Sequence, residues 1–97
     1  MPVGARDAAL AALIAWRRTG RHADHILKTA ARPDMDSRDA ALATQIFYGV
    51  LQNMAYCDHL INAFSTVRTT RLEPQVLDIL RLSVYQLVFL EKIPASA

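Results

Sequence analysis

The sequence predicts an all-α fold, a small bundle of about five helices. Apolar residues recur at helical spacing over most of the chain, and no stretch shows the alternation that is typical of a strand. Glycine and proline are rare, with 3 and 4 of them in 97 residues, so few helices are interrupted. Apolar residues make up 53% of the chain and charged residues 21%, which indicates a folded core and excludes a disordered chain.

The first predicted helix covers residues 5–19. Asp7 lies in its first turn and Arg17 and Arg18 lie in its last, which suits both ends of the helix dipole. Gly20 follows as the stop signal.

A second, shorter helix is predicted over residues 22–31, and Pro33 cannot continue it. A third helix follows, with Asp36 as its N-cap and an apolar stripe along one side. The stripe consists of Leu42, Ala43, Ile46, Phe47, Val50, Leu51 and Met54.

Near Ala55 the stripe passes to a further helix, or to a bent continuation, that ends at Phe64. Residues 65–71 form a polar connector, and the last helix begins at Pro74 and runs to Lys92. This helix is apolar on nearly all sides, as are helices enclosed by several neighbours. Its predicted main face consists of Val76, Leu77, Leu80, Val84, Leu87 and Val88.

Composition also limits where the chain works. Cys57 is the single cysteine, so an internal disulfide is excluded and a reducing cytoplasm is expected. The longest apolar run, residues 82–90, is far shorter than the ~20 residues that span a membrane. A net charge of +2 does not by itself imply nucleic acid.

Residues with potential for metal binding or catalysis are few. His22 and His25 are suitably spaced for a metal, but Cys57 and His59 do not complete a tetrahedral set. The chain has no glycine-rich phosphate loop, nucleophile elbow or paired carboxylates. We therefore expect no catalytic residue, no metal site and no cofactor site in this chain.

Basic residues are concentrated in the first 38 residues. Arg6 and Arg17 are separated by 11 positions, about three helical turns, and so lie on one helix face. With Arg18 and Arg21 they are the candidates for contact with RNA phosphates. Aspartates are interspersed among them, so an ordinary solvated surface is the alternative.

Arg81 falls near the middle of the apolar face of the last helix. A charge in this position must be paired or must line a shared surface. We expect a structural ion pair, and the candidate carboxylates are Asp39, Asp58 and Asp78.

Gly49 lies inside the third helix, where glycine costs about 0.5–1 kcal/mol relative to alanine. Its place at the edge of the stripe predicts that the first or last helix crosses closely there. Asn53 is then expected to form a hydrogen bond near the crossing. Leucine at residue 49 should unfold the domain by overpacking, whereas alanine is expected to be tolerated.

Three segments resemble the NusB-type RNA-binding domain. The first is the opening helix ARDAALAAL, residues 5–13. The others are YGVLQNMAYCDHLI, residues 48–61, and VLDILRLSVYQLVFLEKIPASA, residues 76–97. The matching positions are Gly49, Val50, Asn53, Tyr56, Asp58 and Leu60, then Leu80, Arg81, Tyr85 and Leu87.

Within that family, residues 37–53 and 89–97 are more similar to the N-terminal domain of bacterial rRNA cytosine-5 methyltransferases of the RsmB (Sun) type. Ile14 stands where antitermination factors of the family carry an aromatic residue. The resemblance implies a non-catalytic domain that recognises rRNA beside a separate module, and that module would use S-adenosylmethionine and catalytic cysteines. The alternatives are a transcription antitermination factor, which acts through RNA and a small ribosomal protein, and a protein-interaction module.

The resemblance also implies that residues 1–97 are one truncated domain, because the family domain continues with about two more helices. Without them, part of the last helix should be uncovered at Leu82, Val84, Leu87, Phe89 and Leu90. Soluble monomers rarely expose such a patch. We therefore expect a homodimer through this helix, formed by simple association or by exchanged helices.

Overall fold

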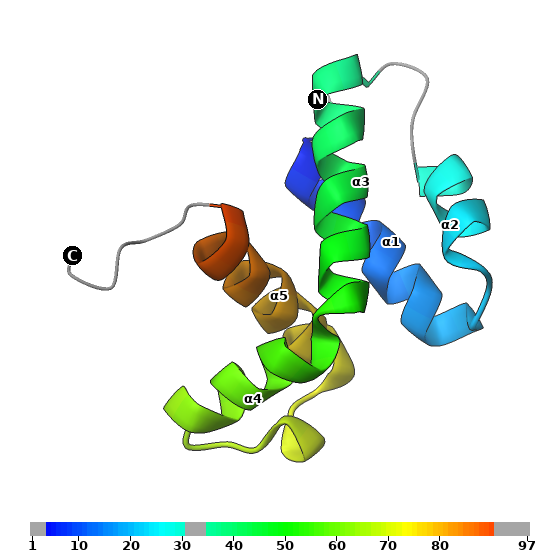
Figure 1. The fold of residues 1–97 in the computed structure, drawn as a ribbon. Helices are drawn as coiled ribbons and strands as arrows, with labels where there is room; N and C mark the ends of the chain where they lie inside the picture. Colours follow the sequence, from blue (N-terminus) through cyan, green and yellow to red (C-terminus); the bar gives the residue numbers. More distant parts are fainter. Residues whose placement is uncertain (1–3, 31–34, 91–97) are drawn as a thin grey trace. The chain divides into compact units, whose positions relative to one another are not determined.

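The computed structural model describes residues 4–30 and 35–90, and in this part of the chain it contains five α-helices and no strand (Figure 1). The predicted all-α fold is confirmed. The chain divides into two compact units, which we call unit 1 (residues 1–48) and unit 2 (residues 49–97). Among the described residues, every helix is too short or too polar to cross a membrane.

Unit 1 contains α1 (Ala5–Thr19), α2 (Ala23–Ala30) and most of α3 (Ser37–Gln52). α1 ends as predicted, because Gly20 adopts the left-handed conformation at φ 67° and donates its N–H to the Trp16 carbonyl at 3.0 Å. After this turn, α2 packs back against α1 (Figure 1). α2 begins one residue later than predicted, and its predicted last residue lies outside the described part of the chain.

Small side chains form much of the core of unit 1. Ala5, Ala8 and Ala43 form one buried cluster, against which Met35 and Leu42 pack. The other buried apolar residues of this unit are Ala9, Ala12, Leu13, Ile26, Ile46 and Phe47. The small side chain of alanine allows neighbouring elements to approach the backbone of α1 closely, which favours close packing.

Two polar contacts stabilise α3 in unit 1: one caps its N-terminal end, and the other joins it to α2. Asp36 accepts the Arg38 N–H on Oδ1 at 3.2 Å, which is the N-cap contact expected from the sequence. The Tyr48 hydroxyl donates a hydrogen bond to Asp24 Oδ1 and so ties α3 to α2. This bond is the main reason why the pKa of Tyr48 is raised above 10.0.

Unit 2 contains the end of α3, then α4 (Met54–Phe64), a 3-10 turn η1 (Thr69–Arg71), α5 (Pro74–Tyr85) and a π-helical segment η2 (Gln86–Leu90). Pro74 occupies the first turn of α5, as predicted. The turn η1 lies in the segment predicted as a polar connector. The last helix does not continue as a regular α-helix to Lys92, because the π-helical segment replaces it from Gln86 and residues 91 and 92 lie outside the described part.

The buried side of α5 differs from its predicted main face. Val76, Leu87 and Val88 are 40%, 47% and 41% exposed, so the predicted face is largely open. The buried residues are instead Asp78, Leu82, Tyr85 and Gln86. The expectation that Leu82 is uncovered is therefore wrong, because Leu82 turns inward with Asp78 and Tyr85 at helical spacing. Of the other residues expected to be uncovered, Leu87 is exposed, and Val84, Phe89 and Leu90 are partly buried.

The change from α-helix to π-helix coincides with competing hydrogen bonds near the end of α5. The Gln86 N–H is shared between the carbonyls of Leu82 and Ser83. Ser83 Oγ also donates to the Ile79 carbonyl at 2.8 Å, and Gln86 Nε2 donates to the Leu82 carbonyl at 3.2 Å. Side chains that bond to the carbonyl four residues earlier compete with the regular backbone bonds of a helix, and they accompany the altered register here.

Candidate nucleic-acid interface

The four arginines proposed to contact RNA all belong to unit 1, on α1 and the turn that follows it. Arg6 is exposed in the first turn of α1, and Arg17 is half-buried in its last turn. Arg18 and Arg21 are exposed on either side of Gly20. The end of α1 therefore gathers three cations, while Arg6 lies at its opposite end.

Local hydrogen bonds hold Arg21 in the turn between α1 and α2. The Arg21 N–H donates to Thr19 Oγ1 at 3.3 Å, and Thr19 Oγ1 donates to the Ala15 carbonyl at 2.7 Å. The Arg21 guanidinium donates through Nη1 to His25 Nε2 at 3.2 Å. Sequence reasoning did not identify Thr19 and His25 as partners of Arg21. The spacing of four residues between Arg21 and His25 is the signal that could have found the second contact.

The resemblance rests on the opening helix, which is in unit 1, and on matching positions from Gly49 to Leu87, which lie in unit 2. Several of the positions in unit 2 form backbone and side-chain contacts with one another. Gly49 lies against α5, where the ring of Tyr85 occupies the space beside its Cα. Asn53 separates α3 from α4 with φ −117° and ψ 21°, and its Nδ2 donates to the Gly49 carbonyl at 2.8 Å. The same carbonyl accepts the Asn53 N–H at 3.0 Å. This double contact explains why the apolar stripe passes to a new helix here and not to a continuous one.

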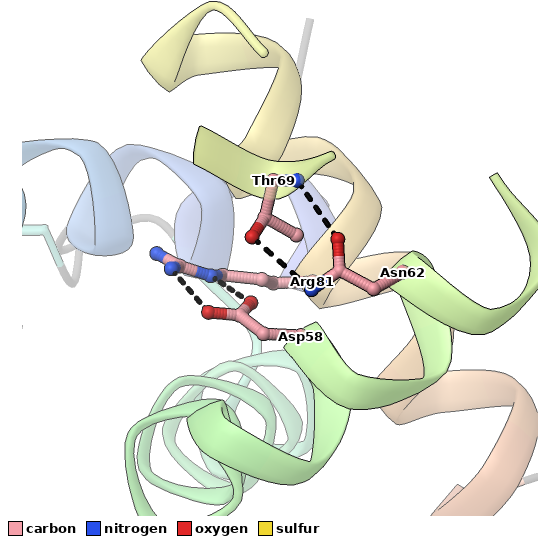
Figure 2. A network of polar contacts seen from close by, with 4 residues as sticks. All are labelled: Asp58, Asn62, Thr69 and Arg81. Carbon is pink, nitrogen blue, oxygen red and sulfur yellow. Dashed lines mark hydrogen bonds and ion pairs between the residues drawn. The ribbon is translucent and has the colours of Figure 1, made fainter. Parts of the chain in front are cut away.

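Asp58 on α4 and Arg81 on α5 form a bidentate ion pair (Figure 2). Arg81 Nε donates to Asp58 Oδ1 at 2.7 Å, and its Nη2 donates to Oδ2 at 2.8 Å. The two side chains are only 13% and 25% exposed, so solvent screens the pair weakly. The hydrogen bond to Asp58 raises the pKa of Arg81, burial opposes this shift, and the charges of Asp58 and Asp78 add to it.

Of the other two carboxylates considered for Arg81, Asp78 is fully buried on α5 and Asp39 lies in the first turn of α3, in unit 1. Only Asp58 meets the planar guanidinium with both oxygens. Such a pair fixes the rotation of α5 against α4 more firmly than a single contact. Arg81 is thus engaged within the fold.

One helical turn beyond Asp58, Asn62 fastens the turn η1 to α4 (Figure 2). Asn62 Oδ1 accepts the Thr69 N–H at 2.9 Å, and Asn62 Nδ2 donates to Thr69 Oγ1 at 3.4 Å. Sequence reasoning missed both residues, because an asparagine and a threonine seven positions apart have no characteristic pattern.

Cys57 is fully buried in unit 2. Burial raises the pKa of its thiol above 9.0, the charge of Asp58 raises it further, and Arg81 opposes the shift. A raised pKa disfavours the thiolate, which is the reactive form, so this cysteine has the character of a small core residue.

Unit 2 also has an apolar groove with a volume of about 400 Å³. It lies between α4 on one side and α5 and η2 on the other. Ser65 is the one polar residue in its lining. The apolar lining consists of Leu60, Ile61, Phe64, Leu80, Val84, Leu87 and Val88. Phe64 is 86% exposed, so its ring projects from the groove into solvent.

The described residues contain no group of three side chains that could hold a metal ion. His22, His25 and His59 are exposed, whereas Cys57 is buried, so these residues do not share one environment. The geometry thus offers surfaces for binding: a cationic end of α1 and an apolar groove.

Comparison with known proteins gives one family and two kinds of relatives. The model of the NusB family matches residues 4–97. A probable ribosomal RNA small subunit methyltransferase B of Bacillus subtilis is 34% identical over 93 residues, which are 95% of this chain and 21% of that protein. The transcription antitermination protein NusB of Coxiella burnetii is 30% identical over 91 residues, which are 93% of this chain and 66% of that protein.

A putative methyltransferase of Mycobacterium tuberculosis is 34% identical over 85 residues, which are 87% of this chain and 19% of that protein. The chain therefore spans about a fifth of the length of the methyltransferase relatives and about two thirds of the antitermination relatives. No solved structure gives a significant match.

Proposed function

We propose a function from one premise, which is that this chain belongs to the NusB family. In this proposal the chain acts as the RNA-recognition domain of an rRNA cytosine-5 methyltransferase and performs no catalysis itself. The observation that supports this proposal is the match to the Bacillus subtilis methyltransferase, in which 95% of this chain corresponds to only 21% of the relative. A segment of that size is one module of a larger enzyme, and the cytoplasm, where rRNA is modified, is its proposed location.

RNA binds, in this proposal, to the cationic surface of unit 1. Arg17, Arg18 and Arg21 contact phosphates around the end of α1, and Arg6 contacts the RNA near its start. Guanidinium groups suit this task because they stay charged and donate in a planar fork to phosphate oxygens. Contacts of this kind position RNA without reading its sequence.

S-adenosylmethionine would be bound by another module of such an enzyme. The apolar groove of unit 2 does not fit this cofactor, because its amino-acid and ribose groups need several hydrogen-bond partners and the groove offers only Ser65 among its lining side chains. Methyl transfer is therefore assigned to no residue of this chain.

The second candidate function is transcription antitermination with RNA and a small ribosomal protein. The Coxiella burnetii NusB relative supports it, since this chain covers 66% of that protein. The reading frame downstream of residue 97 separates the two candidates: a methyltransferase continues for several hundred residues, and an antitermination factor ends after about two helices. A third candidate is a protein-interaction module, and the apolar groove is the feature that favours it.

RNA binding is tested by an electrophoretic shift assay over a salt series, with a single-stranded and a duplex RNA as probes. Affinity should fall steeply as the salt concentration rises. Replacement of all four arginines by glutamine should reduce the magnitude of the slope of log affinity against log salt by about 3–4. Arg38→Gln is the matched control, because Arg38 is exposed in the first turn of α3 and is no part of the proposed surface. Binding that is independent of salt, or unchanged in the four-arginine variant, would contradict the proposal.

A further inference from the structure

Two arginines outside the proposed α1 surface lie at the ends of one tight turn in unit 2. Arg68 precedes η1 and Arg71 ends it, and both side chains are exposed. The Arg71 N–H donates to the Arg68 carbonyl at 2.9 Å, which closes the turn. The Cα atoms at the ends of such a turn lie within about 7 Å of each other, so the side chains of Arg68 and Arg71 leave the backbone close together.

This turn is held in place by contacts that do not use its arginines. Asn62 on α4 bonds to both the backbone N–H and the hydroxyl of Thr69, at 2.9 and 3.4 Å (Figure 2). The Leu72 N–H donates to the Thr69 carbonyl at 3.3 Å and closes the next step of the turn. The backbone that carries the two arginines is therefore ordered before any ligand binds, which lowers the entropy cost of binding.

The charges around the turn leave both arginines available for an anion. Asp58 is engaged with Arg81, and Asp78 is buried. Glu73 is exposed two residues after Arg71. Within the described part of the chain, neither Arg68 nor Arg71 forms an ion pair or a side-chain hydrogen bond.

We propose that this turn is a second phosphate-contacting surface for RNA, on which Arg68 and Arg71 bind adjacent phosphates and Asn62 acts as a positioning residue. The inference rests on the proposed function. RNA is the partner because two forked donors and the exposed Thr70 hydroxyl suit phosphate oxygens, and the turn carries no aromatic side chain or amide that would read a base. The surface contributes affinity that is independent of sequence.

The test measures the affinity of the chain for a short single-stranded RNA of mixed sequence, from about 50 to about 500 mM salt. The variants are Arg68→Gln with Arg71→Gln, the four-arginine α1 variant, and Arg38→Gln as the control for loss of an exposed cation. Removing two phosphate contacts should reduce the magnitude of the slope of log affinity against log salt by about 1.4. If variant and parent bind equally at about 1 M salt, the variant should bind roughly 25-fold more weakly than the parent at about 0.1 M. Circular dichroism checks that each variant keeps its helices.

Asn62→Ala separates positioning from charge, because it leaves both arginines in place. Affinity should fall several-fold while the salt slope stays that of the parent protein, since the number of phosphate contacts is unchanged. A purely structural role for Asn62 would lower stability and leave affinity for RNA unaltered, and that result would overturn its assignment.

The outcomes also distinguish this inference from the proposed function. If the double variant at residues 68 and 71 keeps full affinity and slope while the α1 variant loses both, the second surface is wrong and the proposed function stands. If the parent chain binds no RNA at any salt concentration, both fail. A lower slope in both variants, with no change in the Arg38 control, supports both surfaces.

Discussion

The ring of Tyr85 occupies the position in which residue 49 would carry a Cβ atom. A Cβ built on Gly49 overlaps the ring and hydroxyl of Tyr85, far inside van der Waals contact. Tyr85 is itself confined, because it is only 7% exposed and its ring stacks on Phe89 with a centroid separation of 5.1 Å. The missing side chain of Gly49 is thus the space in which the last α-helix of unit 2 packs.

Gly49→Ala should therefore destabilise the chain, contrary to the tolerance that the sequence suggested. Alanine gains up to about 1 kcal/mol of helix propensity, whereas forcing Tyr85 and Phe89 aside costs about 1–3 kcal/mol. We expect a net loss of about 1 kcal/mol or more in the free energy of unfolding, measured by urea denaturation.

A double-mutant cycle tests the cause of this loss. In a Tyr85→Leu background the ring is gone, and Gly49→Ala should then be neutral or stabilising. Gly4→Ala is the control, because its added Cβ would meet Asp7 at an ordinary 3.6 Å. An equal loss in both backgrounds would show that Tyr85 is not the obstacle.

Arg81→Met should destabilise the fold because it leaves the Asp58 carboxylate partly buried without its forked partner. We expect a loss of about 2 kcal/mol, less than the roughly 3–5 kcal/mol of a fully buried pair. Arg81→Met combined with Asp58→Leu should recover much of this loss, because the double variant leaves no charge behind. An Arg81 variant that keeps its stability but binds RNA less well would instead assign Arg81 to the RNA surface.

Stability should fall as the pH rises through the titration of Cys57. The folded state raises the thiol pKa above its ordinary 9.0, mainly by burial, so the folded state binds this proton more tightly than the unfolded state. The contribution of Cys57 is therefore fully present below about pH 9 and is lost as the pH rises through the folded pKa. Tyr48 stays protonated just above pH 9 because its pKa is also raised, above 10.0.

The measurement is the urea midpoint between about pH 8 and 10.5, compared with Cys57→Ala, in which the midpoint should depend less on pH. Reaction of the thiol with an aromatic disulfide reagent should be slow in the folded protein and fast in urea. A thiol that reacts at the rate of a free cysteine in the folded protein would contradict its burial.

Helix positions could be predicted from the sequence because each start and stop has a local chemical cause. Gly20 ends α1 through its left-handed conformation, Asp36 caps α3, and Pro74 begins α5. These signals act over one turn of chain. They need no knowledge of distant residues.

The buried side of the last helix could not be predicted in the same way. Its residues are apolar nearly all round, so periodicity alone does not select a face, and packing of Tyr85 against Gly49 decides it. The contacts of Asn62 with Thr69 and of Arg21 with His25 also depend on how separate segments meet. For Arg81, chemical reasoning required a carboxylate and named three, and only the structure distinguishes Asp58 from the others.

The exposed apolar surface of unit 2 predicts self-association. The large apolar side chains that are exposed in the described part of the chain all belong to this unit: Tyr56, Phe64, Val67, Val76, Ile79, Leu87 and Val88. Phe64 and Leu87 line the same groove, so one patch contains both a hollow and a projecting ring. A patch of this kind can pair with its own copy about a two-fold axis, because each copy offers the ring that the other can accept.

Light scattering over a concentration series should therefore show a dimer at high concentration. Phe64→Ser and Leu87→Gln should each shift the equilibrium toward the monomer, because each removes apolar area from the contact, worth about 25 cal/mol per Å² buried. Val67→Gln is the matched control, since Val67 is 43% exposed but does not line the groove. A strictly monomeric parent protein at high concentration would contradict the prediction. An equal effect of all three substitutions would mean that general surface hydrophobicity, and not the groove, drives association.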